Sequence, residues 1–484
     1  KYSAGCATVE NMVIYPHGAA ARRPGTQYVA SVKTPAAKTR LIPFEFSTEQ
    51  TYILEFGNQY IRFYRNNGQI ESSGSPYEIS TPYLTAELFD IKFAQSADVM
   101  YITHPNHQTR KLSRTGHTSW TLAAVEFTNG PFLDSNITTT TLTPSSHGVG
   151  TGVTVTASAV TGINSGSGFL ATDVGRQIRI GVGYGIITAR TNTTVVTITI
   201  TTALTNSTAN ADWSLGSFST TTGFPSCVSF FEQRLVFAAS ISNPQTVYFS
   251  KSGDYENMDA NIGGTIADDD AIIYTIASNQ VNAIRFLTSA RTLIIGTAGG
   301  EFVVSGGGDN NAVTPTNIMI KKQSNHGAAN VDAISVGNAT LFLQRAKRKI
   351  RELAYNFDVD GYIAPDLTIL AEHITEGNIV EMAYQEEPLA IIWCVRGDGQ
   401  LIALTYQREQ EVVAWHRHII GGSFGTGNAV VESVAVIPTD DSEYELYMIV
   451  KRTINGATAR YIEYLHTFNF DQTDNTSFNY LDSQ

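Results

Sequence analysis

The chain has 484 residues, of which 42% are hydrophobic and only 16% are charged, and its net charge is −12 at pH 7. This composition provides enough apolar side chains for a core, and it excludes a protein that holds nucleic acid tightly, because that needs clustered Lys and Arg. The three cysteines, Cys6, Cys227 and Cys394, are widely separated and odd in number, which argues against a zinc site or a disulfide framework. No signal peptide and no apolar run of about 18 residues is present, so no membrane span is predicted.

The opening segment, residues 6–28, contains the run Arg-Arg-Pro-Gly at 22–25, and its Pro-Gly pair predicts a turn after a short basic patch. Helix signals are scarce throughout, and the best short candidate, Ala328 to Ile334, is weak. We therefore predict an all-β protein. Because the chain starts at Lys1 and ends in a polar tail, we expect the natural protein to continue beyond this sequence.

Pairs of short apolar runs joined by a turn recur along the chain, most of them spaced by about 45 to 57 residues. A four-stranded propeller blade needs about that much chain. The sequence therefore predicts a β-propeller of about seven blade-like repeats. The first runs of these hairpins begin at Tyr52, Val99, Leu235, Leu293, Leu341, Ile391 and Leu446.

One interval, between the hairpins at Val99 and Leu235, is longer than a single blade requires. The excess is about 85 to 90 residues and corresponds to Asp134 to Gly223, which is rich in Thr, Ser, Gly and Val. Apolar residues alternate with Thr in Val153 to Thr156 and in Val195 to Ile200, which is typical of half-buried strands. We predict an inserted small β-barrel or sandwich, whose Thr-rich surface is either plain solvated sheet or a contact face for a neighbouring subunit.

These patterns divide the chain into five predicted parts. They are an N-terminal segment that completes the propeller platform (1–38), the first propeller blades (39–131), the inserted Thr-rich β-domain (132–223), the remaining blades (224–467) and a C-terminal tail that is possibly truncated (468–484).

Candidate catalytic groups are few. Asp268, Asp269 and Asp270 form the densest acidic cluster, but three consecutive residues cannot all point one way on a strand. We interpret them as a turn that caps the next strand, with a subunit contact or a cation site as the alternatives. Gly299 and Gly300 lack the Lys and the following helix that phosphate binding needs, so we interpret them as a hairpin turn. No cofactor, metal site or catalytic residue is predicted.

His416 and His418 are two residues apart on a predicted strand, which would place both rings on one face, as a metal site could use. No Cys, Asp or Glu follows at ligand spacing. We interpret the two histidines as ordinary surface residues.

The basic run at 345–351 is an exception in this acidic chain. On a strand, Arg345, Lys347, Lys349 and Arg351 would share one face. Three interpretations stay open: a solvated edge strand that discourages aggregation, a salt-bridged contact with an acidic neighbouring subunit, and a contact with the DNA backbone.

Several motifs in one order resemble the tail nozzle protein, or tail tubular protein B, of short-tailed bacteriophages. The resemblance covers the whole chain except the Thr-rich insert, and it extends to 22–25 and to Asp360 to Leu367. The residues that carry it most clearly are Arg234, Gly253, Asp254, Asp268, Asp269, Asp270, Gly299 and Gly300.

The resemblance implies a structural virion protein without enzymatic activity, and its matched motifs are fold signatures with no catalytic residue to carry over. Six copies would form a ring below the portal and the adaptor, with tail fibre or spike proteins as further partners, assembled in the host cytoplasm. The channel of the ring would retain and then conduct double-stranded DNA without binding it specifically. The net negative charge fits such a duct, since attraction to phosphate would slow the passage of DNA.

Two other functions remain open. A carbohydrate-binding or host-recognition tail module would show an exposed aromatic platform and would bind glycans. A propeller glycoside hydrolase would hold two carboxylates about 5 to 10 Å apart in a cleft.

Overall fold

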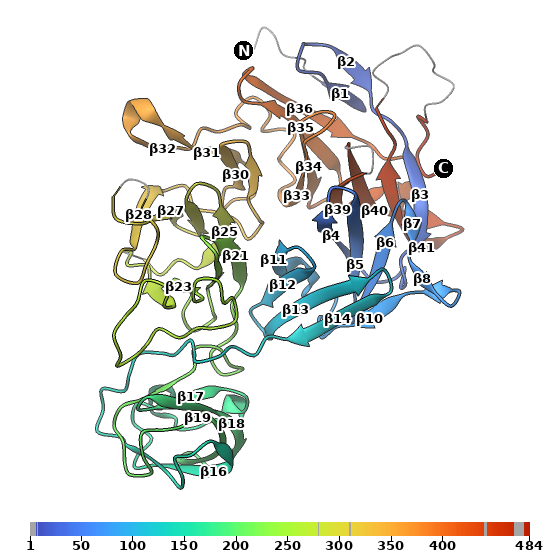
Figure 1. Cartoon of the computed structure of the whole chain (residues 1–484). Coiled ribbons are helices and arrows are strands. Elements are labelled where there is room, and N and C mark those ends of the chain that lie inside the picture. Colours follow the sequence, from blue (N-terminus) through green and yellow to red (C-terminus); the bar gives the residue numbers. More distant parts are fainter. Residues whose placement is uncertain (1–5, 7, 279, 309–310, 440–442, 469–478) are drawn as a thin grey trace.

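The computed structural model describes residues 6, 8–278, 280–308, 311–439, 443–468 and 479–484. The described chain is a β-propeller with an inserted β-domain (Figure 1). Its helical elements are single 3-10 turns: η2 (Leu88–Asp90), η3 (Asn164–Gly166), η4 (Ala171–Asp173) and η5 (Phe357–Val359). No helix within the described ranges has the length and apolar character needed to cross a bilayer.

The described residues contain seven antiparallel sheets that each follow a path of four strands, numbered here as blades 1 to 7 in ring order. Blade 1 has β4 (Arg40–Ser47), β5 (Gln50–Gly57), β6 (Tyr60–Arg65) and β10 (Glu78–Ser80). Blade 2 has β11 (Lys92–Ser96), β12 (Val99–His104), β13 (His107–Gly116) and β14 (Ser119–Ala124). Blade 3 has β21 (Cys227–Phe231), β22 (Arg234–Ala238), β23 (Thr246–Phe249) and β24 (Ile272–Thr275).

Blade 4 has β25 (Ile284–Ser289), β26 (Leu293–Thr297), β27 (Gly300–Ser305) and β28 (Met319–Ser324). Blade 5 has β29 (Ile334–Val336), β30 (Ala339–Leu343), β31 (Ile350–Asn356) and β32 (Gly361–Ile363). Blade 6 has β33 (Ile379–Gln385), β34 (Ile391–Arg396), β35 (Leu401–Gln407) and β36 (Val412–His418). Blade 7 has β39 (Val430–Pro438), β40 (Tyr444–Ile454), β41 (Ala457–Leu465) and, from the other end of the chain, β3 (Thr26–Ser31).

The ring is closed by blade 7, which combines strands from both ends of the chain. β3 pairs with β41 in the antiparallel register Thr26↔Leu465, so the fourth strand of the last blade comes from the start of the chain. The first strands of neighbouring blades contact one another, β4 with β39 and β11 with β21, and therefore surround the axis. Seven apolar clusters each join two adjacent blades, so the core is distributed around the ring between the sheets.

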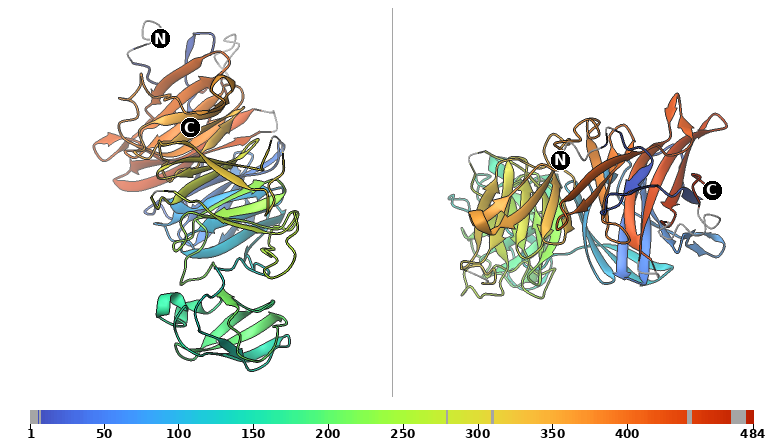
Figure 2. Two further views of the ribbon diagram at one scale, coloured as in Figure 1. Left: turned by 90° about the vertical axis from the view of Figure 1, so that its left-hand side faces the viewer. Right: turned by 90° about the horizontal axis from the view of Figure 1, so that it is seen from above.

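The inserted domain leaves the ring between β14 and β21. It consists of β15 (Leu142–Pro144), β16 (Gly150–Ala157), β17 (Gln177–Ile180), β18 (Gly183–Arg190), β19 (Val195–Thr202) and β20 (Trp213–Leu215), in the sheet order β15-β16-β19-β18-β17-β20. Reciprocal backbone hydrogen bonds of 2.9 Å between Leu142 and Asn210 join the two edges, so the sheet closes around its own apolar core as a small barrel. Figures 1 and 2 show this domain as a separate lobe beside the propeller.

Smaller elements lie at the periphery: the hairpins β1 (Met12–Ile14) with β2 (Ala20–Arg22), β8 (Glu71–Ser72) with β9 (Ser75–Pro76) and β37 (Ser423–Phe424) with β38 (Gly427–Asn428), and β7 (Gly68–Gln69), which pairs with β6. The weak helix prediction for Ala328 to Ile334 is wrong. This segment is an extended connection that leads into β29, because Ala328, Ala329 and Val331 are buried in the clusters on either side of blade 5.

Candidate functional site

The two faces of the ring differ in charge. In each antiparallel blade, the turns after the first and third strands lie on one face, which we call the acidic face. The turn after the second strand and the connections between blades lie on the other, which we call the insert face because it carries the inserted domain. Exposed acids on the acidic face are Glu49, Glu71, Glu232, Asp254, Asp268, Asp269, Asp358, Asp360, Glu386, Glu387, Glu409 and Glu411. In the same described turns, the exposed bases are Arg291 and Arg408. The described turns and connections of the insert face, leaving the inserted domain aside, expose fewer acids and more bases: Asp90, Glu126, Glu372, Glu376 and Asp398 with Lys33, Arg345 and Arg348.

A cavity of about 270 Å³ lies at the centre, lined from β4, β11, β33, β39 and the segment before β29. Arg40 on β4 donates through Nε to Glu381 on β33 at 3.1 Å. The other oxygen of Glu381 accepts hydrogen bonds from Ser433 Oγ at 2.7 Å and Val434 N at 2.9 Å. Burial raises the pKa of Glu381, while Arg40, Ser433 and Val434 oppose that rise. A cavity of this size suits a small molecule and not a DNA duplex.

A second ion pair lies in the same cavity. Lys92 Nζ is 2.6 Å from Asp332 Oδ1, and the ammonium group is almost completely buried. Of the three carboxylates that line this cavity, Glu381 and Asp332 have cationic partners, and burial raises the pKa of the third, Glu45. The two pairs join blades that are not neighbours in the ring, blade 1 with blade 6 and blade 2 with the segment before blade 5, and buried charges are expected to be paired in this way.

Arg234 has a structural role in blade 3. It is buried on β22, and its guanidinium donates to the carbonyl oxygens of Ser250 at 2.7 Å, Asp268 at 2.6 Å and Asp270 at 2.7 Å. One side chain thus fixes the backbone of two turns on the acidic face. The acidic run at 268–270 is accordingly a turn before β24.

The carboxylate of Asp270 completes this turn. Its Oδ2 accepts a hydrogen bond from Ala267 N at 2.8 Å, and Lys251 Nζ lies 3.0 Å from its Oδ1. Burial alone would raise the pKa of Asp270, but the Ala267 amide and Lys251 lower it. Asp268 and Asp269 remain exposed.

The remaining signature residues divide between the two faces. Gly253, with φ +76°, and the exposed Asp254 lie in the β23–β24 connection near Arg234. Gly299 and Gly300 form the β26–β27 turn on the insert face, so the structure does not bring them to the Arg234 cluster. Gly300 has φ +155°, and a Cβ there would meet a backbone oxygen of β28 at 2.5 Å, which explains the need for glycine.

The prediction that Arg345, Lys347, Lys349 and Arg351 share one face of a strand is wrong. Residues 345–349 form the turn between β30 and β31 on the insert face, where Lys347 has φ +60°, and only Arg351 lies on a strand. A turn directs successive side chains differently from the alternation of a strand.

Two of these four bases have partners within the chain. Lys349 pairs with Asp366 at 2.9 Å and with Glu372 at 3.1 Å. Arg351 donates to the carbonyl oxygen of Ala364 at 2.7 Å. Arg345 is exposed, so it is the most accessible of the four predicted contact residues.

The interpretation of His416 and His418 as surface residues is also wrong. Both are buried, with 0% and 1% exposure, and His416 Nδ1 lies 2.7 Å from His418 Nε2. His416 Nε2 is 3.1 Å from Thr405 Oγ1. Burial lowers the pKa of His416 to about 3, and burial together with His416 and Arg23 lowers that of His418. The two rings form a neutral hydrogen-bonded pair in blade 6.

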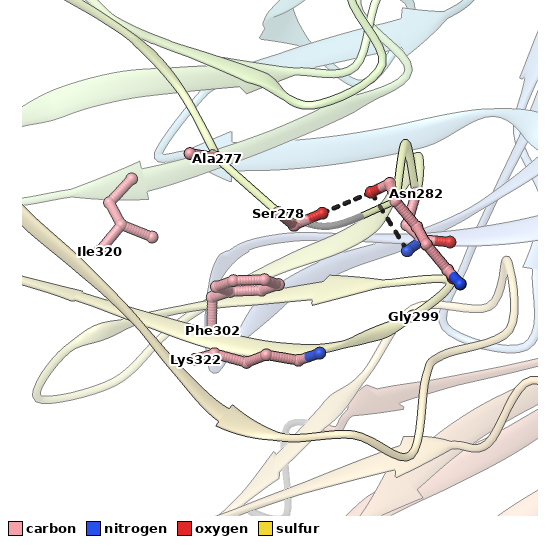
Figure 3. Close-up of a pocket in the computed structure, with 8 residues that line it drawn as sticks. Ala277, Ser278, Asn282, Gly299, Phe302, Ile320 and Lys322 are labelled. Atoms are coloured by element: carbon pink, nitrogen blue, oxygen red, sulfur yellow. Dashed lines mark hydrogen bonds between the residues drawn. The ribbon is translucent and has the colours of Figure 1, made fainter.

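A pocket of about 460 Å³ opens on the insert face between blades 3 and 4 (Figure 3). The loop with Ser278 and Asn282 lies across from Phe302 and Lys322. Among the lining residues only Lys322 carries a charge, so the pocket offers a cation and amide groups but no acid–base pair.

No family model and no curated protein matches the chain. Among solved structures, YCF48 bound to a D1 peptide is 8% identical over 93% of this chain and 97% of that chain, with a TM-score of 0.40. The WD40 repeats of RRP9 are 7% identical over 92% and 99%, with a TM-score of 0.41. BamB from Moraxella catarrhalis is 7% identical over 92% and 99%, with a TM-score of 0.34. Similarities this low say nothing about function, and the class of protein, a seven-bladed β-propeller, follows from the sheet topology.

Proposed function

We propose that this chain is a structural virion protein, a subunit of the tail nozzle ring of a short-tailed bacteriophage. The proposal starts from the motifs at 22–25, 231–237, 250–255, 268–270 and 293–302, which resemble that family. Within the described residues, Arg234 holds two turns of blade 3 in place, which is a structural role of the kind that the family resemblance implies.

The acidic face is the observation that carries the proposal. A surface along which DNA slides must not bind phosphate, and exposed carboxylates repel it over about 8 to 10 Å at physiological ionic strength. The central cavity of one propeller is too small for a duplex, so the DNA channel forms between copies of the chain. We place the acidic face toward that channel in a ring of about six copies, the number that the family resemblance implies.

The insert face is then available for protein partners. It carries the inserted domain and the exposed Arg345 and Arg348. We assign to this face, and to the outer edge of the propeller, the contacts with the adaptor, with fibre or spike proteins and with a neighbouring copy. No specific binding of DNA is proposed. The assembled protein resides in the virion.

Electron microscopy of the purified chain, alone and mixed with its adaptor, tests the proposal. The expected result is a ring whose lumen is lined by the turns that carry Glu386 and Glu409. Monomers alone in the presence of the adaptor, or a lumen lined by the turn at 345–349, would contradict it.

A second candidate function, a carbohydrate-binding tail module, is favoured by one feature. A cavity of about 420 Å³ lies where the inserted domain meets blade 3, and its lining includes Asp134, Ser165, Trp213, Ser242 and Asn243. Hydroxyl, amide and carboxylate groups beside an indole suit a sugar. Saturable binding of a host surface glycan, lost in Asp134→Ala, would favour this function over the nozzle. The third candidate function is a glycoside hydrolase. Cleavage of host glycan by the purified chain would be needed to support it.

A further inference from the structure

Three metal-ligating side chains meet on the insert face between blades 1 and 2. Glu87 comes from the connection between the two blades, directly before η2. His104 and His107 are paired residues at the ends of β12 and β13, separated by the turn Pro105-Asn106. Their candidate ligand atoms all lie within 4.8 Å of one another.

These residue types suit a transition-metal ion. Two imidazoles and one carboxylate are a ligand set that Zn²⁺ takes in proteins, with water in the remaining position.

The present hydrogen bonds are ones that a metal would replace. His107 Nε2 lies 2.9 Å from Glu87 Oε2, and Asn106 N approaches His104 Nδ1 at 3.2 Å. Ligand atoms around tetrahedral Zn²⁺ are about 3.4 Å apart, so the widest separation in the cluster must shorten by at most about 1.4 Å. Glu87 and His107 are partly exposed, with 19% and 23% of their side chains accessible, which gives an ion a path from solvent.

Tyr83 forms the floor of the cluster. Its ring is completely buried and meets the His107 ring edge-on at 5.3 Å and the His104 ring at 6.1 Å. Its hydroxyl group has no hydrogen-bond partner among the described residues. This buried aromatic floor holds both imidazoles in place, and side chains that bind a metal need such support.

We propose that Glu87, His104 and His107 form a binding site for a divalent transition-metal ion, with Zn²⁺ the preferred occupant. The ion fixes the joint, by which we mean the region where the inserted domain is attached to the propeller. Phe224, where the chain returns from the insert, donates its amide to the carbonyl oxygen of Pro105 at 2.9 Å, so the turn between the two histidines also carries the returning chain.

Calorimetric titration of the chelator-treated full chain with ZnCl₂ tests the site. One Zn²⁺ per chain is expected, with a Kd on the order of 1 μM. His107→Gln and Glu87→Gln are each expected to weaken binding at least about 100-fold, since even the partners behind metal ligands contribute 10- to 100-fold. The exposed His147 in the inserted domain provides the matched control, and His147→Gln should bind as the parent does.

Co²⁺ gives an independent readout, because its visible absorption reports whether imidazole and carboxylate groups coordinate it. The parent chain should develop these bands with one equivalent of CoCl₂, and the Glu87 and His107 variants should not. Absence of saturable Zn²⁺ or Co²⁺ binding, or binding that survives in both variants, overturns the site. If Zn²⁺ binds but does not slow hydrogen exchange at the Phe224 amide, its role at the joint is overturned.

Discussion

Arg23 and Asp482, 459 residues apart in the chain, form an ion pair in which both guanidinium nitrogens, Nη1 and Nη2, lie 2.7 Å from the two carboxylate oxygens. The carboxylate also accepts hydrogen bonds from Thr26 N at 3.2 Å and Gly421 N at 2.7 Å. Burial alone would raise the pKa of Asp482, but Arg23 lowers it. The Arg-Arg-Pro-Gly motif therefore fastens residues 479–484 to the closing strand β3 and to the connection between blades 6 and 7.

Removal of this carboxylate should destabilise the ring closure. Asp482→Ala leaves the buried Arg23 guanidinium without its counterion, and breaking such a pair costs about 3 kcal/mol. Denaturant unfolding followed by tryptophan fluorescence measures the loss. Glu10→Gln, which breaks the half-exposed pair with Arg417, is the control and should cost less than about 1 kcal/mol. Equal losses in the two variants would contradict a special role for the Asp482 pair.

Arg234→Lys should loosen the turns of blade 3 while keeping the charge. A lysine cannot reach the carbonyl oxygens of Ser250, Asp268 and Asp270 at once, so about 2 to 4 kcal/mol should be lost. Limited proteolysis should then cut within 250–271 faster than in the parent. Arg348→Lys, at an exposed position in the β30–β31 turn, should leave both stability and cleavage unchanged.

The seven central hairpins could be predicted from the sequence because the second and third strands of a blade are buried on both faces. β30 (Ala339–Leu343) and β22 (Arg234–Ala238) are buried along their whole length and therefore form continuous apolar or nearly apolar runs. Outer strands give a weaker signal: β28 (Met319–Ser324) exposes Lys321 and Lys322. The number of blades could thus be inferred, whereas the first and fourth strands could not be placed.

The groups at the centre of the ring could not be paired from the sequence. Arg40 and Glu381 are 341 residues apart, and the only local hint is a carboxylate inside the apolar run that begins β33. For Glu87, His104 and His107, the turn explains why the histidines meet, but the carboxylate comes from a different blade connection. Such contacts depend on how the blades are arranged around the ring, and the local sequence pattern does not encode that arrangement.

Stability should fall with acid because of His416 and His418. The folded pKa of each is far below the unfolded value of about 6.5, so this contribution is complete above pH 6.5 and is lost as the pH falls toward the folded values. Each unit below 6.5 costs about 1.4 kcal/mol per histidine, or about 3 to 4 kcal/mol in total between pH 7 and pH 5. Denaturant unfolding at each pH measures this dependence.

The double variant His416→Gln/His418→Gln separates these two groups from the carboxylates that also titrate in acid. Its stability should vary by about 3 to 4 kcal/mol less than that of the parent over the same interval. His147→Gln, at an exposed site, should follow the parent curve. If the double variant loses as much stability as the parent, the histidine pair is not the origin of the acid sensitivity.

The acidic face should be needed for rapid DNA passage. Glu386→Lys/Glu411→Lys reverses two exposed charges on that face, and Glu126→Lys/Glu376→Lys makes the same change in net charge on connections of the insert face. New cations beside the duplex attract phosphate, so the first variant should slow genome ejection and the second should not. The rate of DNA release from phage particles built with each variant measures the difference.

Salt provides the decisive comparison between the two variants. Phosphate contacts weaken steeply as salt rises, so added NaCl should restore the ejection rate of Glu386→Lys/Glu411→Lys toward that of the parent. A slowing caused by faulty assembly would not respond in this way, because salt does not rebuild a missing ring. If both variants slow ejection equally at low salt, charge acts through the whole particle and the acidic face does not line the channel.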